Sequence, residues 1–348
     1  MKTFGCGGLG VNSRIKARRG VSNGVLVGIA ALTAVHLAGC EAELQLDGVS
    51  ASLAQAVRRT DQFLAAELSE TGGVVAFADN GVVVEASDAT SLNWVRTELA
   101  PLTANFIGST ACASGTVYAL SFENQLWSRQ PTGWQPRSVP TEEQLQSVAC
   151  SPSGTLLLTG AFGTLLKSDD SGESWKDLSF YDDFTLTAAS FGTQEVGYAV
   201  GEFGTIAKSS DGGDSWVLLE PIADDFYPLS VHFSDAERGW VSGVLGVIFH
   251  TMDGGQSWRR EKADTPASLY GFIESDDGAL YAYGDLGALL VRDPDSGSWV
   301  DFPSPDIPVH YADAVLRGDQ LLLVGGWGLV VDVSLATTSP ADHQIGEL

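Results

Sequence analysis

Basic residues are scarce in this chain, whose 348 residues include 19 lysines and arginines against 44 aspartates and glutamates. Five of those bases lie in the first 39 residues, which contain no acid, so the rest of the chain carries a net charge of −30. Such a charge repels phosphate, which argues against nucleic acid as a partner and against adhesion to anionic lipid. Cationic partners and membrane proteins with basic loops fit it better, and solubility alone explains it equally well.

Histidine is nearly as scarce, and beyond residue 39 the chain has only four. These histidines are His232, His250, His310 and His343. Their spacing is not that of metal ligands, and no glycine-rich loop of the kind that cradles phosphate is present. We therefore expect neither a metal site nor another cofactor.

The first 39 residues contain an apolar run, Val25 to Ala38, that is too short to span a bilayer as a stable helix. It follows a basic segment and ends in a small-residue cleavage site, which is typical of a signal peptide. The sequence Leu37-Ala38-Gly39-Cys40 resembles the lipobox of bacterial lipoproteins, which implies that Cys40 becomes the lipidated first residue. Because Glu41 rather than aspartate follows, that resemblance implies an outer-membrane lipoprotein facing the periplasm. The alternative is an ordinary secretory signal with a chance cysteine.

Tryptophans recur at intervals of 40 to 42 residues through the rest of the chain. They are Trp94, Trp134, Trp175, Trp216, Trp258 and Trp299. Each follows two apolar segments joined by a short turn, most clearly at 156–166 and 198–207, and seven such units can be recognised between residues 70 and 335. A period near 41 with four short strands per unit predicts a seven-bladed β-propeller of four-stranded antiparallel blades, an all-β fold.

The ends of the chain flank this propeller. Residues 1–39 are the expected signal peptide, and residues 336–348 are a C-terminal tail. The segment 40–69 is a linker that contains either a short helix or a strand that closes the ring, because the last unit ends without a tryptophan of its own.

Cys112 and Cys150 occupy equivalent positions in neighbouring units. An export compartment permits a disulfide between them, but equivalent positions on neighbouring strands can also exceed the distance that a disulfide bridges. A disulfide and two buried thiols are therefore both open.

A second motif precedes the tryptophan in the three middle units, with the pattern Ser/Thr-x-Asp-x-Gly-x-Ser-Trp. Its main residues are Asp170, Gly172 and Trp175, then Asp211, Gly213 and Trp216, then Asp253, Gly255 and Trp258. This is the Asp-box, in which the aspartate bonds the backbone of its own turn, the glycine takes a positive φ and the tryptophan fills the space between blades. We assign it a structural role, without catalytic residues.

Asp-box propellers include sialidases and the photosystem II assembly-factor family of seven-bladed propellers. Segments such as 197–206 and 237–243 resemble the repeats of the second family, and the likeness covers about residues 70–335. This resemblance implies a non-enzymatic scaffold that assists a membrane or envelope protein, such as a transporter, as a monomeric propeller. The chain departs from the family's arginine-rich binding surface, because its ten arginines beyond the signal are scattered.

A carbohydrate-binding or sialidase-like propeller is the alternative function. Sialidase chemistry needs three converging arginines, a tyrosine nucleophile and an acid. The arginines of this chain do not fall at repeated positions that would aim them at the propeller axis. We therefore expect no enzyme and no catalytic residue.

The turns between second and third strands, and the links between blades, share one face of a propeller. The expected binding residues on that face are Phe162, Phe203, Leu245, Leu286, Trp327, Asp183, Asp225 and Tyr227. Exposed apolar tips beside acids form a surface that fits a protein partner. The alternative is that each tip packs against the next blade.

Overall fold

A computed structural model describes residues 51–69, 71–99, 104–223, 226–305 and 309–335. The expected signal peptide, Cys40, Asp225 and the C-terminal tail lie outside these residues. No helix among the described residues is long and apolar enough to cross a membrane.

Seven antiparallel sheets form the blades, numbered here in chain order. Blade 1 contains β1 (Phe63–Leu68), β2 (Val74–Ala78), β3 (Val82–Ala86) and β4 (Val95–Glu98). Blade 2 contains β5 (Phe106–Ala111), β6 (Val117–Ser121), β7 (Gln125–Gln130) and β8 (Gly133–Ser138). Blade 3 contains β9 (Leu145–Cys150), β10 (Leu156–Gly160), β11 (Leu165–Ser168) and β12 (Lys176–Asp177). Blade 4 contains β13 (Leu186–Phe191), β14 (Gly197–Gly201), β15 (Ile206–Ser209) and β16 (Val217–Leu218).

The remaining three blades continue the pattern. Blade 5 contains β17 (Pro228–Phe233), β18 (Gly239–Gly243), β19 (Ile248–Thr251) and β20 (Arg259–Glu261). Blade 6 contains β21 (Leu269–Glu274), β22 (Leu280–Gly284), β23 (Leu289–Arg292) and β24 (Trp299–Asp301). Blade 7 contains β25 (Tyr311–Arg317), β26 (Gln320–Gly325) and β27 (Leu329–Ser334). Six blades thus have four strands, and blade 7 has three within the described residues.

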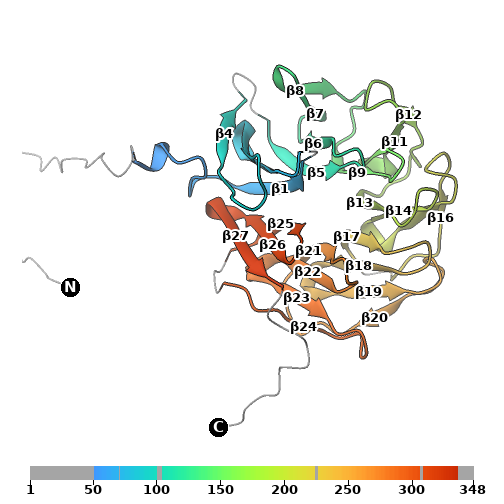
Figure 1. The fold of residues 1–348 in the computed structure, drawn as a ribbon. Helices are drawn as coiled ribbons and strands as arrows, with labels where there is room; N and C mark the ends of the chain where they lie inside the picture. Colours follow the sequence, from blue (N-terminus) through green and yellow to red (C-terminus); the bar gives the residue numbers. More distant parts are fainter. Residues whose placement is uncertain (1–50, 70, 100–103, 224–225, 306–308, 336–348) are drawn as a thin grey trace, which may run out of the picture. The chain divides into compact units, whose positions relative to one another are not determined.

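The first strands of the blades line the axis of the ring. Each of β1, β5, β9, β13, β17 and β21 contacts the first strand of the next blade, and β25 contacts β1. Figure 1 shows the resulting circle of sheets, with blade 7 beside blade 1. The second strands are apolar runs buried along nearly their whole length, as expected for strands covered on both sides by neighbouring blades. The seven-bladed propeller predicted from the sequence is confirmed.

The strand β1 begins at Phe63, ahead of residue 70, and pairs with β2 in blade 1. Within the segment 40–69, the described helical residues are 51–53, and residues 63–68 are a strand. Residues 40–50 lie outside the described residues, so a closing strand there stays a prediction.

The segment that precedes β1 holds the last turn of blade 7, because the Gly328 N–H donates to the Asp61 carbonyl at 2.7 Å. Packing of β1 on β25, this main-chain contact and a hydrogen bond from the Ala66 N–H to the Asp313 carboxylate are among the contacts that join blades 1 and 7.

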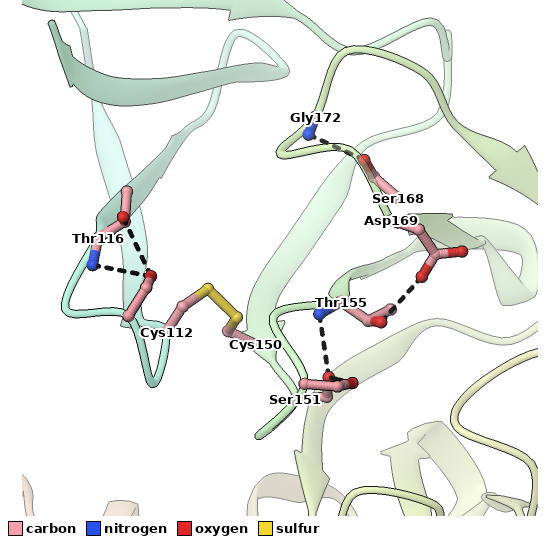
Figure 2. Close-up of a disulfide and its surroundings, with 10 residues drawn as sticks. Cys112, Thr116, Cys150, Ser151, Thr155, Ser168, Asp169 and Gly172 are labelled. Carbon is pink, nitrogen blue, oxygen red and sulfur yellow. Dashed lines mark hydrogen bonds between the residues drawn. A yellow bond between two sulfur atoms is a disulfide. The ribbon is translucent and has the colours of Figure 1, made fainter.

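A disulfide joins blades 2 and 3. Cys112 follows β5 and Cys150 ends β9, and their Cα atoms lie 5.2 Å apart. Figure 2 shows the bridge beside the first turn of blade 3, where the Ser151 hydroxyl accepts a hydrogen bond from the Thr155 N–H at 3.0 Å. Of the two alternatives for these cysteines, the disulfide is the one formed.

The Asp-boxes are local hydrogen-bond networks. In the copy in blade 3, Asp170 accepts bonds from the Ser174 N–H at 2.8 Å and from its hydroxyl at 2.6 Å. The Ser168 hydroxyl accepts from the Gly172 N–H at 2.8 Å, and the next two copies repeat these bonds. These hydrogen bonds lower the pKa of Asp170 to about 2. Every recurring tryptophan packs against a hydrophobic cluster. Trp134 and Trp299 are buried, and the other four are partly buried.

Candidate functional site

The turns between second and third strands carry an unusual residue in blades 3 to 7. At their centre lie Phe162, Phe203, Leu245, Leu286 and Trp327, with φ between 53° and 60°. These side chains are 54% to 71% exposed. The left-handed region costs a residue with a Cβ roughly 1–2 kcal/mol, and large apolar residues rarely adopt it. The alternative that each tip packs against the next blade is therefore wrong.

Blade 1 has asparagine at the same position of the turn, where Asn80 has a φ of 56°. In blade 2 the equivalent residue is Glu123, and Asn124, with a φ of 54°, takes the place of the glycine that follows the tip in the other blades. Asparagine tolerates this conformation because its short polar side chain can form local hydrogen bonds, and the side chain is also polar enough to face water. The chain therefore accepts both a strained backbone and exposed apolar surface in five blades, although blade 1 shows that neither is required by the fold.

Links between blades hold these turns in place. The Gly163 N–H donates to the Phe184 carbonyl at 2.6 Å, and the Gly204 N–H donates to the Phe226 carbonyl at 2.9 Å. Both phenylalanines are buried beneath the turns. A side chain on Gly204 would collide with the carbonyl of Ala223, so glycine is required there. We call the surface made by these turns and links the tip face; the hydrogen bonds show that turns and links share it, as predicted.

Other predicted binding residues also lie on the tip face. Asp183 is exposed and Tyr227 is 38% exposed. Three further exposed aromatic residues are Phe122, Tyr181 and Tyr270, which are 56%, 77% and 36% exposed. Tyr181 belongs to the same link as the predicted Asp183, whereas the sequence prediction omitted Phe122 and Tyr270. Phe122 directly precedes the turn centre in blade 2, so position within the repeat was the signal that could have found it.

Carboxylates dominate the tip face between blades 3 and 6. The acids in the described turns and links of these blades are Asp182, Asp183, Glu202, Glu220, Asp264 and Asp285. Lys262 is the one base in the same segments. Burial and the charge of Glu202 raise the pKa of Tyr227, and burial and the charge of Asp285 raise the pKa of Tyr270. Carboxylates therefore lie near exposed aromatic rings on this face.

The opposite face carries the Asp-boxes, and two of its lysines are bonded across the seams between blades. The Lys167 ammonium contacts Asp214 at 2.6 Å and Asp169 at 3.0 Å, joining blade 3 to the box of blade 4. The Lys208 ammonium donates to the Gly254 carbonyl at 3.1 Å across the next seam. These residues bind neighbouring blades to each other, in keeping with a structural role for the Asp-box.

The arginines do not form a cluster that would bind a substrate carboxylate. Eight of the ten arginines beyond residue 39 form ion pairs with acids of this chain. Within the part of the chain that the structure describes, no group of three or more potential metal ligands comes together. The described geometry thus offers neither the arginine clamp of a sialidase nor a metal centre.

The fold and its repeats define a class: an Asp-box β-propeller of seven blades. The propeller resembles the photosystem II assembly-factor family, and residues 181–271 match the family model described as photosynthesis system II assembly factor YCF48. The structure of YCF48 from Cyanidioschyzon merolae superposes with a TM-score of 0.64 at 14% identity, covering 80% of this chain and 97% of that one. A structure titled YCF48 bound to D1 peptide has a TM-score of 0.63 at 14% identity, covering 80% and 94%.

Enzymes share the architecture as well. A catalytically inactive virginiamycin B lyase from Staphylococcus aureus with quinupristin superposes with a TM-score of 0.68 at 12% identity, covering 80% of this chain and 96% of that one. In sequence, the immune protein Tsi7 of Pseudomonas aeruginosa is 29% identical over 76 residues, which are 19% of this chain. The chain spans about a quarter of the length of that curated relative. The structural likenesses, all at low identity, establish the fold alone.

Proposed function

We propose that this protein is a non-enzymatic scaffold that binds an envelope or membrane protein, such as a transporter, through the tip face. The observation that carries the proposal is the set of five exposed apolar residues in left-handed conformation. Strained backbone that the fold does not require is found at functional sites, and exposed apolar side chains gathered on one face are typical of protein-binding sites. The assembly-factor likeness supports the same function, since a YCF48 structure is titled as a complex with a peptide.

The tip Phe203 provides the direct test. The variant Phe203→Asn places in blade 4 the residue that blade 1 has at Asn80. We expect partner recovery to fall about tenfold or more, because burying one phenylalanine at an interface contributes roughly 1.5–3 kcal/mol. The free energy of unfolding should stay unchanged or rise by up to about 1 kcal/mol, because the strain is relieved.

Recovery is measured by quantitative mass spectrometry after affinity capture from cross-linked envelopes, and stability by denaturant unfolding. The matched control is Val217→Asn, because Val217 is 60% exposed on the outer strand β16, away from the tips. Equal recovery with wild type and both variants would exclude the tip face as the binding surface.

We further propose that Cys40 carries lipid and holds the protein at the outer membrane, facing the periplasm. The support is the sequence Leu37-Ala38-Gly39-Cys40 after a basic and then apolar segment. The variant Cys40→Ser should move the protein from the membrane fraction into the soluble periplasmic fraction, as measured by immunoblotting of fractionated cells. Continued membrane attachment of the variant would contradict the anchor.

Carbohydrate binding is a second candidate, favoured by a groove of about 640 Å³ between blades 1 and 2. Blade 2 has only a short turn in place of an Asp-box, so the flank of blade 1 is less covered there. Asn93, Gln130 and Arg129 line the groove beside Trp134. Such polar side chains over an apolar floor suit a sugar, and a glycan array without signal would remove this candidate.

A further inference from the structure

We propose that the tip face binds an extended, cationic segment of its partner, in which arginine or lysine alternates with apolar residues. This inference rests on the proposed function and names the chemistry of the partner. It commits to a basic peptide segment rather than a lipid surface or a nucleic acid.

The negative charge of the tip face favours a cationic partner. Six acids and one base lie in the described turns and links of blades 3 to 6. Where these segments are described, none of the six carboxylates belongs to an ion pair of the propeller. Some carboxylates of the Asp-box face are bonded within their own turns or to the neighbouring blade, and others, such as Asp276 and Asp295, are exposed and belong to none of the ion pairs of the described residues. On the tip face, in contrast, unpaired carboxylates lie beside the exposed apolar tips, and complementary charge accelerates and orients association.

Aromatic rings beside those carboxylates favour a cationic partner as well. The phenol of Tyr181 donates to Asp177 at 2.8 Å, which orients the ring while 77% of the residue stays exposed. Glu202 lies next to the turn centre Phe203 and acts on the phenol of Tyr227 in the next blade. An ammonium or guanidinium group over such a ring gains roughly 0.5–1 kcal/mol in an exposed setting and more when desolvated. The long methylene stems of arginine and lysine also cover apolar surface, so one side chain can contact both a carboxylate and an apolar tip.

Hydrogen bonds hold the turns and links of the tip face in place. The turns are bonded to the links through Gly163 and Gly204, and the Glu202 carboxylate accepts from the Thr185 N–H at 2.8 Å. The main chain of Leu286 bonds the Asp285 carboxylate at 2.8 Å in the equivalent turn of blade 6. Side chains fixed in this way lose little conformational entropy on binding. The tip face is thus preorganised to bind a segment of opposite charge.

The test uses three synthetic peptides in which leucine alternates with arginine, glutamine or glutamate. Titration of the full-length protein at low salt should show binding of the arginine peptide, with affinity that falls as salt is raised, and at least about tenfold weaker binding of the other two. The triple variant Asp183→Asn, Glu202→Gln, Asp285→Asn should weaken binding of the arginine peptide by about tenfold or more. Asparagine and glutamine keep an acceptor oxygen for the turn contacts, so the fold is retained.

The matched control changes net charge equally on the opposite face, at exposed Asp276, Asp295 and Asp319. It should leave affinity within about twofold of wild type. Equal weakening by both triple variants would overturn the inference, since only net charge would then act. Binding of anionic lipid vesicles in place of the arginine peptide would overturn it too. If Phe203→Asn abolishes partner recovery while the tip-face charge variant does not, the proposed function stands and the cationic partner is excluded.

Discussion

The variant Glu261→Ala is expected to lower the free energy of unfolding by about 3–5 kcal/mol, the cost of breaking a buried ion pair by removing one partner. Glu261 ends β20 and is only 4% exposed. Its carboxylate accepts from the Arg292 guanidinium at 2.7 and 2.9 Å and from the Trp299 indole at 2.9 Å. The His250 Nδ1 atom lies 3.3 Å away. Alanine would leave a guanidinium and an indole N–H without their acceptor at the seam between blades 5 and 6.

The stabilisation that Glu261 provides is also expected to depend on pH. Burial alone would raise the pKa of Glu261, but hydrogen bonds from His250 and Arg292 outweigh it and lower the pKa to about 2. A folded pKa below the unfolded value means that the stabilisation is complete above about pH 4.5 and is lost as pH falls towards 2. The difference in free energy of unfolding between wild type and Glu261→Ala should therefore shrink as pH falls from about 4.5 towards 2.

Denaturant unfolding of both proteins between pH 2 and pH 7 measures the effect. The matched control is Glu173→Ala, because Glu173 pairs with Arg137 at the surface and its side chain is 66% exposed. That control should cost no more than about 1 kcal/mol. If Glu261→Ala costs as little as the control, the buried network does not stabilise the seam.

The sequence predicts the propeller because its signals are local to each repeat. An Asp-box needs only the residues from Ser168 to Trp175 to complete its hydrogen bonds, and each copy shows them in one short segment. The second strand of each blade is an apolar run, and such a run likewise predicts a strand that is buried on both sides. Repetition at a fixed period then gives the number of blades without any knowledge of contacts between them.

Contacts between repeats leave no such signal. Glu261 meets Arg292 and Trp299 of the next blade, and three residues scattered over two repeats form no motif. Ring closure depends on the contact between Asp61 and Gly328, which lie at opposite ends of the propeller. The proposed binding residues were predicted from their place in the repeat. Their exposure depends on turn geometry, and a residue such as Phe203 looks the same in sequence whether it packs inward or faces solvent.

The acidic tip face also bears on the comparison with the assembly factors. The chain shares their fold, yet eight of its ten arginines beyond residue 39 form ion pairs, and the six acids in the described turns and links of blades 3 to 6 form none. If the tip face binds a partner as proposed, its negative charge selects a different partner, because charge complementarity determines which partners are rejected as well as which are bound. The shared architecture is therefore compatible with a separate client protein.

A pH-dependent effect is also expected at Glu67, which lies in β1, the first strand of blade 1. The Ser109 hydroxyl donates to it at 3.0 Å, and Asp313 of β25 lies nearby. The Asp313 carboxylate joins the two blades, because it accepts from the Ala66 N–H at 2.9 Å and from the Tyr283 hydroxyl at 2.8 Å. Burial, followed by the charge of Asp313, raises the pKa of Glu67 to about 8.

A folded pKa above the unfolded value means that Glu67 contributes most below about pH 4.5, and that this contribution is lost as pH rises towards 8. The full shift corresponds to roughly 4–5 kcal/mol, and the partial contact of Glu67 with solvent reduces the expected loss to about 2–3 kcal/mol. The variant Glu67→Gln is neutral at every pH. It should match wild type within about 1 kcal/mol at pH 5 and exceed its free energy of unfolding by about 2–3 kcal/mol at pH 9.

Denaturant unfolding from pH 5 to pH 9 measures the difference, with Glu142→Gln as the control for loss of one exposed carboxylate. The gap between wild type and Glu67→Gln should open through the window between the unfolded pKa and about pH 8, while the control follows wild type throughout. Two parallel curves for Glu67→Gln and wild type would mean that Glu67 is ionised at neutral pH. Closure of the ring would then not depend on a protonated acid at the seam.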